Sequence, residues 1–289
     1  MRKFLIIEKI NIVDANAFSS AYTIGFPAMP AWLGFVHNLQ RKLSLSYSNL
    51  KLSNVGIVCN DFEARLFKEN KFSRNCVIEK RHPLIKDGKT DAFIEEPLCS
   101  LNVSLIIELA NLQKYDEDDF IKSLSKLLKA NIKIASGNIW SYKNINIKSI
   151  DEDNSDDIKK ILTKLNSGFA IINKSSLLKE DMKLNNLTAF DSLVSFMEVK
   201  SKANIDENKN VQWTNNRKTK GWLVPIAVGY QGLSKLSIIH NQRDKDVKHR
   251  FAEAIVSLGE FIMPYRLTSI DEMLWHYEYI ENKNLYLCK

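Results

Sequence analysis

Cysteine is scarce in this 289-residue chain, and its four copies are scattered. No CxxC pair occurs, so the sequence predicts neither a disulfide framework nor a zinc site. Cys59 and Cys99 stand inside apolar runs, where a free thiol acts as a small hydrophobic side chain. The chain also lacks HExxH, HxH, Walker A and dinucleotide-loop patterns, which removes the common signatures of zinc peptidases and nucleotide-binding enzymes.

Long apolar runs are missing as well. The N-terminal segment is interrupted by Glu8 and Lys9 and has no signal-peptide core, and no segment is apolar enough to span a bilayer. These absences predict a cytoplasmic chain without a membrane partner. The composition is that of a globular protein, and Lys plus Arg outnumber Asp plus Glu by 41 to 34. The net charge of +7 favours a polyanionic partner, although solubility alone produces similar surpluses.

The segment 16–43 raises the first functional question. Residues 3–13 alternate as a strand does, and the loop 14–29 that follows contains Gly25 and Pro27. Beyond the loop, apolar residues recur at helical spacing and predict a helix from about residue 30 to 42. A glycine-containing loop between a strand and a helix either offers backbone N–H groups to an anion such as phosphate or is a plain turn.

The predicted elements of the first half run in the order strand, helix, strand, insertion, strand, helix, strand. This order matches a βαββαβ unit, so the predicted fold class is α+β with a ferredoxin-like or RRM-like core. The insertion, about 66–97, is rich in Lys and Arg and predicts a projecting β-hairpin with a turn at Asp87–Gly88. Besides the first strand and helix, the predicted elements of this half span 54–67, 98–111, 116–129 and 131–150.

We expect a domain boundary near residue 150, with 1–150 as the first domain and 151–289 as a mixed helix–strand region that contacts partners. Residues 200–220 are polar and lysine-rich, and they predict a loop that is disordered without a partner. Apolar spacing predicts a long helix over 247–264 and a short one over 270–280. The other predicted elements are a helix ending at 166, a strand at 168–174, a helix at 188–199 and an ordered apolar segment at 221–236.

Basic residues interleaved with aromatic residues point to single-stranded nucleic acid, which is bound by positive charge and stacking surfaces together. A solvated basic face beside ordinary core aromatics explains the same pattern equally well. The basic members are Arg65, Arg74, Lys80, Arg81, Lys86, Lys89, Arg217, Lys218 and Lys220, and the aromatic ones are Phe67, Phe72, Phe93, Trp213 and Trp222.

The stretch NIVDANAFSSAYTIGFPAMPAWLGFVHNLQRKL (11–43) resembles the Cas-five-type subunit, the second Csy protein, of the type I-F CRISPR surveillance (Csy) complex. The resemblance continues along almost the whole chain. The further segments that carry it are VGIVCNDFEA (55–64), RHPLIKDGKT to EEP (81–97), LNVSLII (101–107), GWLVPIAVGYQGLS (221–234), RFAEAIVSLGEFIMPYRL (250–267) and the LW pair at 274–275.

The resemblance implies a non-catalytic RNA-binding subunit without a cofactor. It implies pairing with the Cas-eight-type large subunit, with which the subunit holds the 5′ handle of the CRISPR RNA. It also implies a thumb, the insertion, against the Cas-seven-type backbone subunit, and support of target DNA recognition by guide pairing. On this sequence the expected RNA contacts are Asn16, Ser19, Ser20, Thr23, Gly25 and Phe26 in the loop, Arg65, Lys80, Arg81 and His82 at the thumb, and Arg217, Lys218, Lys220 and Trp222 at a second surface.

Two alternatives remain open from the sequence. The first is a metal-independent ribonuclease that processes the CRISPR RNA, for which His37, Tyr22 and His82 are the candidate acids and bases. Nothing in the sequence pairs these residues, and the apolar stripe near His37 predicts that its side chain is packed in the core. The second alternative is a subunit that binds protein and makes little contact with RNA.

Overall fold

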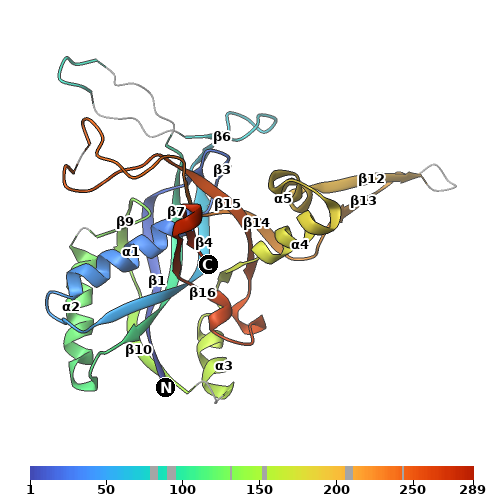
Figure 1. Ribbon diagram of the computed structural model, residues 1–289. Helices are drawn as coiled ribbons and strands as arrows, with labels where there is room; N and C mark the ends of the chain where they lie inside the picture. Colours follow the sequence, from blue (N-terminus) through green and yellow to red (C-terminus); the bar gives the residue numbers. More distant parts are fainter. Residues whose placement is uncertain (79–83, 90–95, 131, 152–154, 206–210, 243) are drawn as a thin grey trace.

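The computed structural model describes residues 1–78, 84–89, 96–130, 132–151, 155–205, 211–242 and 244–289. Within these ranges the chain is a mixed α+β protein with a twelve-stranded antiparallel sheet and five α-helices (Figure 1). The helices are α1 (Met29–Leu43), α2 (Glu117–Lys129), α3 (Ser155–Lys164), α4 (Ser175–Asn185) and α5 (Ala189–Met197).

Strands from both halves of the chain share the large sheet. Its main path is β17-β18-β14-β15-β11-β4-β7-β1-β9-β8, with β10 paired to β1 and β16 paired to β4. Its strands are β1 (Arg2–Asn16), β4 (Lys51–Ala64), β7 (Leu98–Ala110), β8 (Lys133–Ile134), β9 (Gly137–Ser141), β10 (Asn144–Ile150), β11 (Phe169–Asn173), β14 (Trp222–Gly232), β15 (Ala252–Ile262), β16 (Leu274–Trp275), β17 (Tyr277–Ile280) and β18 (Leu285–Cys288). Three two-stranded sheets lie outside it: β2 (Phe18–Ser20) with β3 (Thr23–Ile24), β5 (Leu66–Phe67) with β6 (Cys76–Val77), and β12 (Val199–Ile205) with β13 (Val211–Arg217).

The centre of the sheet is covered on both faces, which explains the unbroken apolar run of the first strand. Leu5 and Ile7 pack in the main hydrophobic cluster with α1 and α2. Phe4 and Ile6, which point to the opposite face, pack in a second cluster with α3. Because successive strand residues alternate between faces, a strand buried on both sides reads as continuous hydrophobicity. Figure 1 shows α1 and α2 on one side of the sheet and α3 on the other.

The helix predicted at residues 30–42 is confirmed as α1. Pro30 lies in its first turn, where the missing N–H costs nothing. Trp32, Phe35 and Leu39 are buried on one side, and Arg41 and Lys42 occupy the last turn, where positive charge favours the helix dipole. Burial of this apolar stripe, rather than intrinsic propensity, fixes the helix against β4 and β14.

Most other predictions for the first half are also confirmed. The strands predicted at 54–67 and 98–111 correspond to β4 and β7, and the helix predicted at 116–129 corresponds to α2. Asp87–Gly88 forms the predicted turn, in which the Gly88 N–H donates to the Ile85 carbonyl at 2.9 Å. The region predicted as strand, glycine turn and strand at 131–150 contains β8, β9 and β10. Of the insertion, β5 and β6 are paired at its base, whereas 79–83 and 90–95 lie outside the described residues.

Two helix predictions in the second half are wrong. Residues 252–262 form the strand β15, and 270–280 contain a short 3-10 turn followed by β16 and β17. Leu258 packs in the cluster of α4 and α5, whereas Phe261 packs against the main cluster on the other face. A strand with both faces packed presents apolar residues at helical as well as strand spacings, so periodicity alone cannot separate the two.

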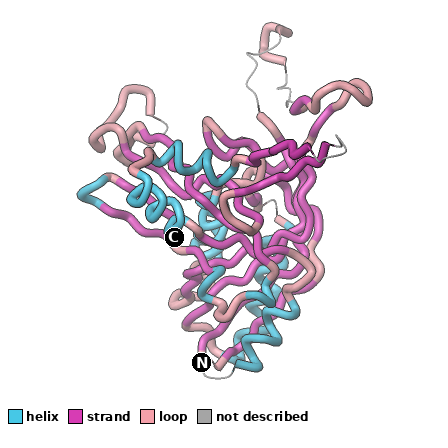
Figure 2. The backbone as a smooth tube through the Cα atoms, turned by 90° about the vertical axis from the view of Figure 1, so that its right-hand side faces the viewer, coloured by secondary structure: helices cyan, strands magenta, loops and turns pink. Residues whose placement is uncertain are grey.

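The loop predicted at 200–220 is also wrong, because β12 and β13 form an antiparallel ribbon across this region. The predicted strand at 168–174 and the helices ending at 166 and beginning at 188 are confirmed as β11, α3 and α5. Sequence reasoning missed α4 between them. Together α4, α5, β12 and β13 form an arm that extends sideways from the large sheet, seen in Figure 1 and from a second direction in Figure 2. No helix in the described part of the chain is long and apolar enough to cross a membrane.

Candidate nucleic-acid interface

The loop between β1 and α1 is a small structured hairpin. β2 and β3 pair within it, and the Gly25 N–H closes it with a 2.8 Å bond to the Ala17 carbonyl. Gly25 has φ +154°, a conformation that residues with a side chain rarely adopt. The chain therefore needs a glycine at position 25 to lead from the hairpin towards α1. A glycine at this position also allows the backbone to approach a ligand closely.

The hydroxyl groups predicted to contact RNA are largely engaged inside this hairpin. The hydroxyls of Ser19 and Ser20 bond that of Thr23 at 2.8 and 2.7 Å, and Ser20 is buried. Asn16 accepts a 2.7 Å bond from the Phe18 N–H through its side-chain oxygen. These bonds pre-form the shape of the hairpin and leave the Asn16 amide N–H group, Ser19 and Thr23 as its partly accessible polar positions.

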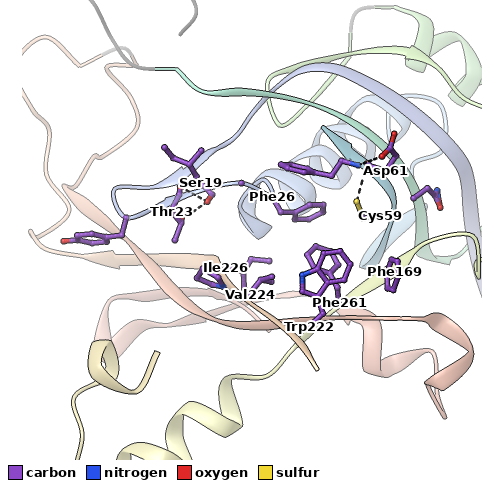
Figure 3. Close-up of a pocket in the computed structure, with 16 residues that line it drawn as sticks. Ser19, Thr23, Phe26, Cys59, Asp61, Phe169, Trp222, Val224, Ile226 and Phe261 are labelled. Carbon is purple, nitrogen blue, oxygen red and sulfur yellow. Dashed lines mark hydrogen bonds between the residues drawn. The ribbon is translucent and has the colours of Figure 1, made fainter. Parts of the chain in front are cut away.

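One flank of the hairpin forms the wall of a cavity of about 560 Å³ (Figure 3). Five of the predicted RNA contacts line it, namely Ser19, Thr23, Gly25 and Phe26 from the loop and Trp222 from a distant part of the sequence. The facing walls come from β4, β14 and β15 and from Phe169 at the start of β11. The structure thus brings the loop together with Trp222, a residue of the second predicted RNA-binding surface.

Aromatic rings connect the interior to the cavity in an unbroken series. Trp32, fully buried, stacks on Phe26 with centroids 5.4 Å apart. Phe26 meets Phe261 at 5.3 Å, and Phe261 meets Trp222 at 5.1 Å. Phe169 contacts Trp222 edge-on at 5.1 Å. Trp222 is 51% exposed, so the series ends in an indole that is supported by aromatic neighbours and accessible from outside.

The cavity itself does not provide phosphate binding. Among the described residues that line it, Asp61 is the charged one, and none is Lys, Arg or His. Cys59 donates through its thiol to the Asp61 carbonyl oxygen at 3.4 Å. Burial, with a further contribution from the Asp61 carboxylate, raises the pKa of the Cys59 thiol to about 12, so it stays neutral and weakly reactive. The site is suited to an uncharged planar group with hydrogen-bond donors.

The predicted basic residues are not gathered at this cavity. Arg65 pairs with Asp14 beside the hairpin, and Lys80, Arg81 and His82 lie outside the described residues. Arg217 and Lys220 are exposed near the base of the arm.

Lys218 lies in a different environment from its basic neighbours. Its ammonium group contacts Asp181 at 2.6 Å and the Ser195 hydroxyl at 2.8 Å, and lies 4.6 Å above the Phe196 ring. The hydrogen bond from Lys218, together with one from Ser192, lowers the pKa of the Asp181 carboxyl to about 2. Lys218 therefore fastens the end of β13 to α4 and α5.

The residues considered for ribonuclease chemistry are not assembled in the described parts of the chain. Tyr22 is 82% exposed at the tip of the hairpin. His37 is exposed on α1, so the expectation that it is packed in the core was wrong. The apolar stripe of α1 runs through positions 32, 35, 36 and 39, and position 37 falls on the opposite side. Across the described ranges, no group of three or more His, Cys, Asp or Glu could hold a metal ion.

Sequence reasoning missed the cavity residues Phe169, Phe261, Asn60, Asp61, Val224 and Ile226. Alternation along 221–236 could have placed Val224 and Ile226 on one face with Trp222, because they are two residues apart. Phe261 cannot be placed in this way, because apolar spacing predicts a helix over its segment.

The class of protein follows from comparison with known sequences. The family model described as CRISPR-associated protein (Cas_Csy2) matches residues 5–288, nearly the whole chain. The chain therefore belongs to this family of CRISPR-associated proteins. A relative, the CRISPR-associated protein Csy2 of Pseudomonas aeruginosa (strain UCBPP-PA14), is 30% identical over 308 aligned positions, which cover 98% of this chain and 93% of the relative.

Proposed function

We propose that the chain is a non-catalytic, Cas-five-type subunit of a type I-F CRISPR surveillance complex, in which it binds the 5′ handle of the CRISPR RNA. The observation that carries the proposal is the family match over residues 5–288. The cavity beside the hairpin supports it, because an aromatic wall without basic residues suits an unstacked base better than a phosphate.

The strand order supports a ferredoxin-like core in residues 1–150. Taken as four core strands, β1, β4, β7 and the β9–β10 pair stand in the spatial order 4-1-3-2, with α1 and α2 as the two connecting helices. In this proposal the insertion at 66–97 is the thumb that meets the Cas-seven-type backbone subunit. Residues 151–289 complete the fold and contribute to the pairing with the Cas-eight-type large subunit.

The proposed path of the RNA follows from the distance between the aromatic residues, which stack on a base, and the basic residues, which bind phosphates. A handle base lies against Trp222 and Phe26, with its donors towards Asp61. The chain segment around it passes Asn16, Ser19, Thr23 and the backbone at Gly25. Phosphates on either side reach the basic positions Arg65, Lys80, Arg81 and His82 towards the thumb, and Arg217 and Lys220 towards the arm. Ser20 and Lys218 act indirectly, because both are committed to internal bonds.

The proposal is tested by comparing two tryptophan variants. The chain is expressed with the proteins encoded beside it and a CRISPR array, and handle RNA binding is measured for Trp222→Ala and Trp140→Ala. Trp140 is 81% exposed on β9, away from the cavity, and serves as the matched control. Loss of one stacked base costs about 1–3 kcal/mol, so Trp222→Ala should weaken handle binding about 5- to 150-fold, and Trp140→Ala should not.

Unfolding temperatures of both variants establish that the fold is retained. Equal handle affinity of the two variants would contradict base binding in the cavity. A complex that assembles but carries no RNA would instead favour a purely protein-binding subunit. Trimming of a precursor RNA by this chain, lost on His37→Ala, would favour the nuclease.

A further inference from the structure

The β12–β13 ribbon has one face made only of polar and basic residues. Residues that pair across two antiparallel strands lie on the same face, and faces alternate along each strand. The register places Lys200 opposite Asn216, Lys202 opposite Thr214 and Asn204 opposite Gln212. We call these six residues the polar face. The other face carries Ser201, Ala203, Trp213 and Asn215, together with Val199 and Arg217 at the base.

The polar face is solvent-accessible along its described length. Residues 199–204 and 211–217 are all exposed. Lys200 contacts Glu198 at 3.4 Å, but both side chains are largely exposed, so this ion pair is weak. The Asn204 amide contacts the Thr214 hydroxyl at 3.4 Å within the face itself. Its lysines and amides are therefore accessible to an external partner.

The ribbon is held firmly at its base, although an isolated two-stranded hairpin is only marginally stable in water. The Lys218 ammonium, directly after β13, bonds Asp181 on α4 and Ser195 on α5. Asp181 is only 6% exposed and also accepts a 2.6 Å bond from Ser192. The base of the ribbon is thus fastened to α4 and α5, and the ribbon extends away from the large sheet (Figure 1).

We propose that the polar face of the β12–β13 ribbon binds duplex DNA in the major groove. Two strands of seven residues extend about 20 Å, and a two-stranded ribbon fits the major groove of B-form DNA, which is about 12 Å wide. Lys200 and Lys202 contact phosphates, whereas Asn204, Gln212 and Asn216 offer the amide groups that pair with base edges. The charge surplus of the chain, +7, is complementary to this partner.

Duplex RNA is excluded as the occupant by groove geometry, because its major groove is too deep and narrow for side chains to read. The inference rests on the proposed function, because a subunit of a CRISPR surveillance complex is expected to support target DNA recognition. It names a surface for that role which is separate from the hairpin cavity. The two sites therefore predict different responses to the same variants.

The test measures binding of the full chain to a fluorescent duplex of about 20 bp, or two helical turns, over a series of salt concentrations. The variant Lys200→Ala/Lys202→Ala removes two cations from the polar face. The control Lys126→Ala/Lys129→Ala removes two exposed cations from α2, far from the arm. The first should weaken duplex binding and reduce the slope of log K against log salt by about 2. The control should leave the slope unchanged.

Three further measurements complete the experiment. Asn204→Ala/Gln212→Ala should weaken binding, whereas the opposite-face pair Ser201→Ala/Asn215→Ala should not. A major-groove ligand such as methyl green should compete, and a minor-groove ligand should not. Handle RNA is measured in parallel. If the polar-face variants lose duplex binding but retain RNA binding, the result supports the ribbon as a DNA site. If they lose only RNA binding, the result counts against the ribbon as a DNA site and places RNA on the arm.

Equal slopes for the two lysine variants would overturn the proposal. Competition by the minor-groove ligand alone would also overturn it, because the ribbon would then lie in the wrong groove. If the polar-face variants bind duplex normally but no longer co-purify with the large subunit, the ribbon is a protein interface and the proposal fails.

Discussion

Replacement of Gly25 by Ala tests how the hairpin beside the cavity is built. Gly25 has φ +154°, and a Cβ atom placed on it meets no other atom within 4 Å. The substitution therefore adds no steric overlap, and its whole cost is backbone strain. Residues with side chains in such rarely populated conformations cost about 1–3 kcal/mol.

Part of that strain is offset, because Ala has fewer conformations than Gly in the unfolded chain, which is worth about 0.4–1 kcal/mol. The free energy of unfolding should thus fall by about 1–2 kcal/mol, and the unfolding temperature by roughly 2–3 °C for a chain of this size. The strain is located beside Phe26, so the cavity wall should shift and handle RNA binding should weaken as well.

Gly34 provides the matched control for the same substitution. It lies within α1, and a Cβ atom added there would be 4.0 Å from the nearest atom, the Tyr277 hydroxyl oxygen. Ala is favoured over Gly inside a helix by about 1 kcal/mol, so Gly34→Ala should stabilise the chain. Urea unfolding of both variants measures directly whether each substitution raises or lowers the free energy of unfolding. A Gly25→Ala variant as stable as the parent chain would refute the strain argument.

Two predictions concern ionisation. The Lys218 ammonium and Ser192 hydroxyl keep the pKa of Asp181 near 2, below the ordinary 3.8, so the unfolded chain binds more protons between about pH 4 and 2. The stabilisation is complete above pH 4 and is lost as pH falls through 2. Urea unfolding across this window should therefore show a flatter pH dependence for Asp181→Asn than for the parent chain, and parallel curves would contradict the ion pair. Burial raises the pKa of three thiols, at Cys59, Cys99 and Cys288, to about 12, whereas Cys76 is exposed. A thiol reagent at pH 8 should modify one cysteine rapidly in the folded chain and all four in guanidinium, and rapid reaction of more than one would contradict the described burial.

The first half of the fold was predictable because its elements carry unambiguous local signals. The apolar stripe of α1 has strict helical spacing and is bounded by Pro30 and two basic residues. The run at 98–110 contains Val103, Ile106 and Ile107, whose branched side chains favour a strand. Such signals depend on neighbours in sequence, so a single chain is enough to detect them.

The second half was less predictable because partners far apart in sequence decide its structure. β15 is a strand because β14 and β11 pair with its two edges, and its apolar pattern allows either structure. The β12–β13 ribbon has few buried side chains, so its sequence resembles that of a loop. In the sequence Lys218 resembles an ordinary surface charge, and only the folded structure shows its contacts with α4 and α5. The cavity was hard to predict for the same reason, because its residues Phe169, Trp222 and Phe261 come from three different strands.

The most direct test of the central proposal is ultraviolet crosslinking of the assembled complex, followed by mass spectrometry of the peptides attached to the 5′ handle. We expect crosslinks at Trp222 or Phe26 and within the hairpin 16–26, because a base stacked on an aromatic ring is well placed to react. Handle RNA that crosslinks only to other subunits, or to surfaces of this chain away from the cavity, would contradict the proposal.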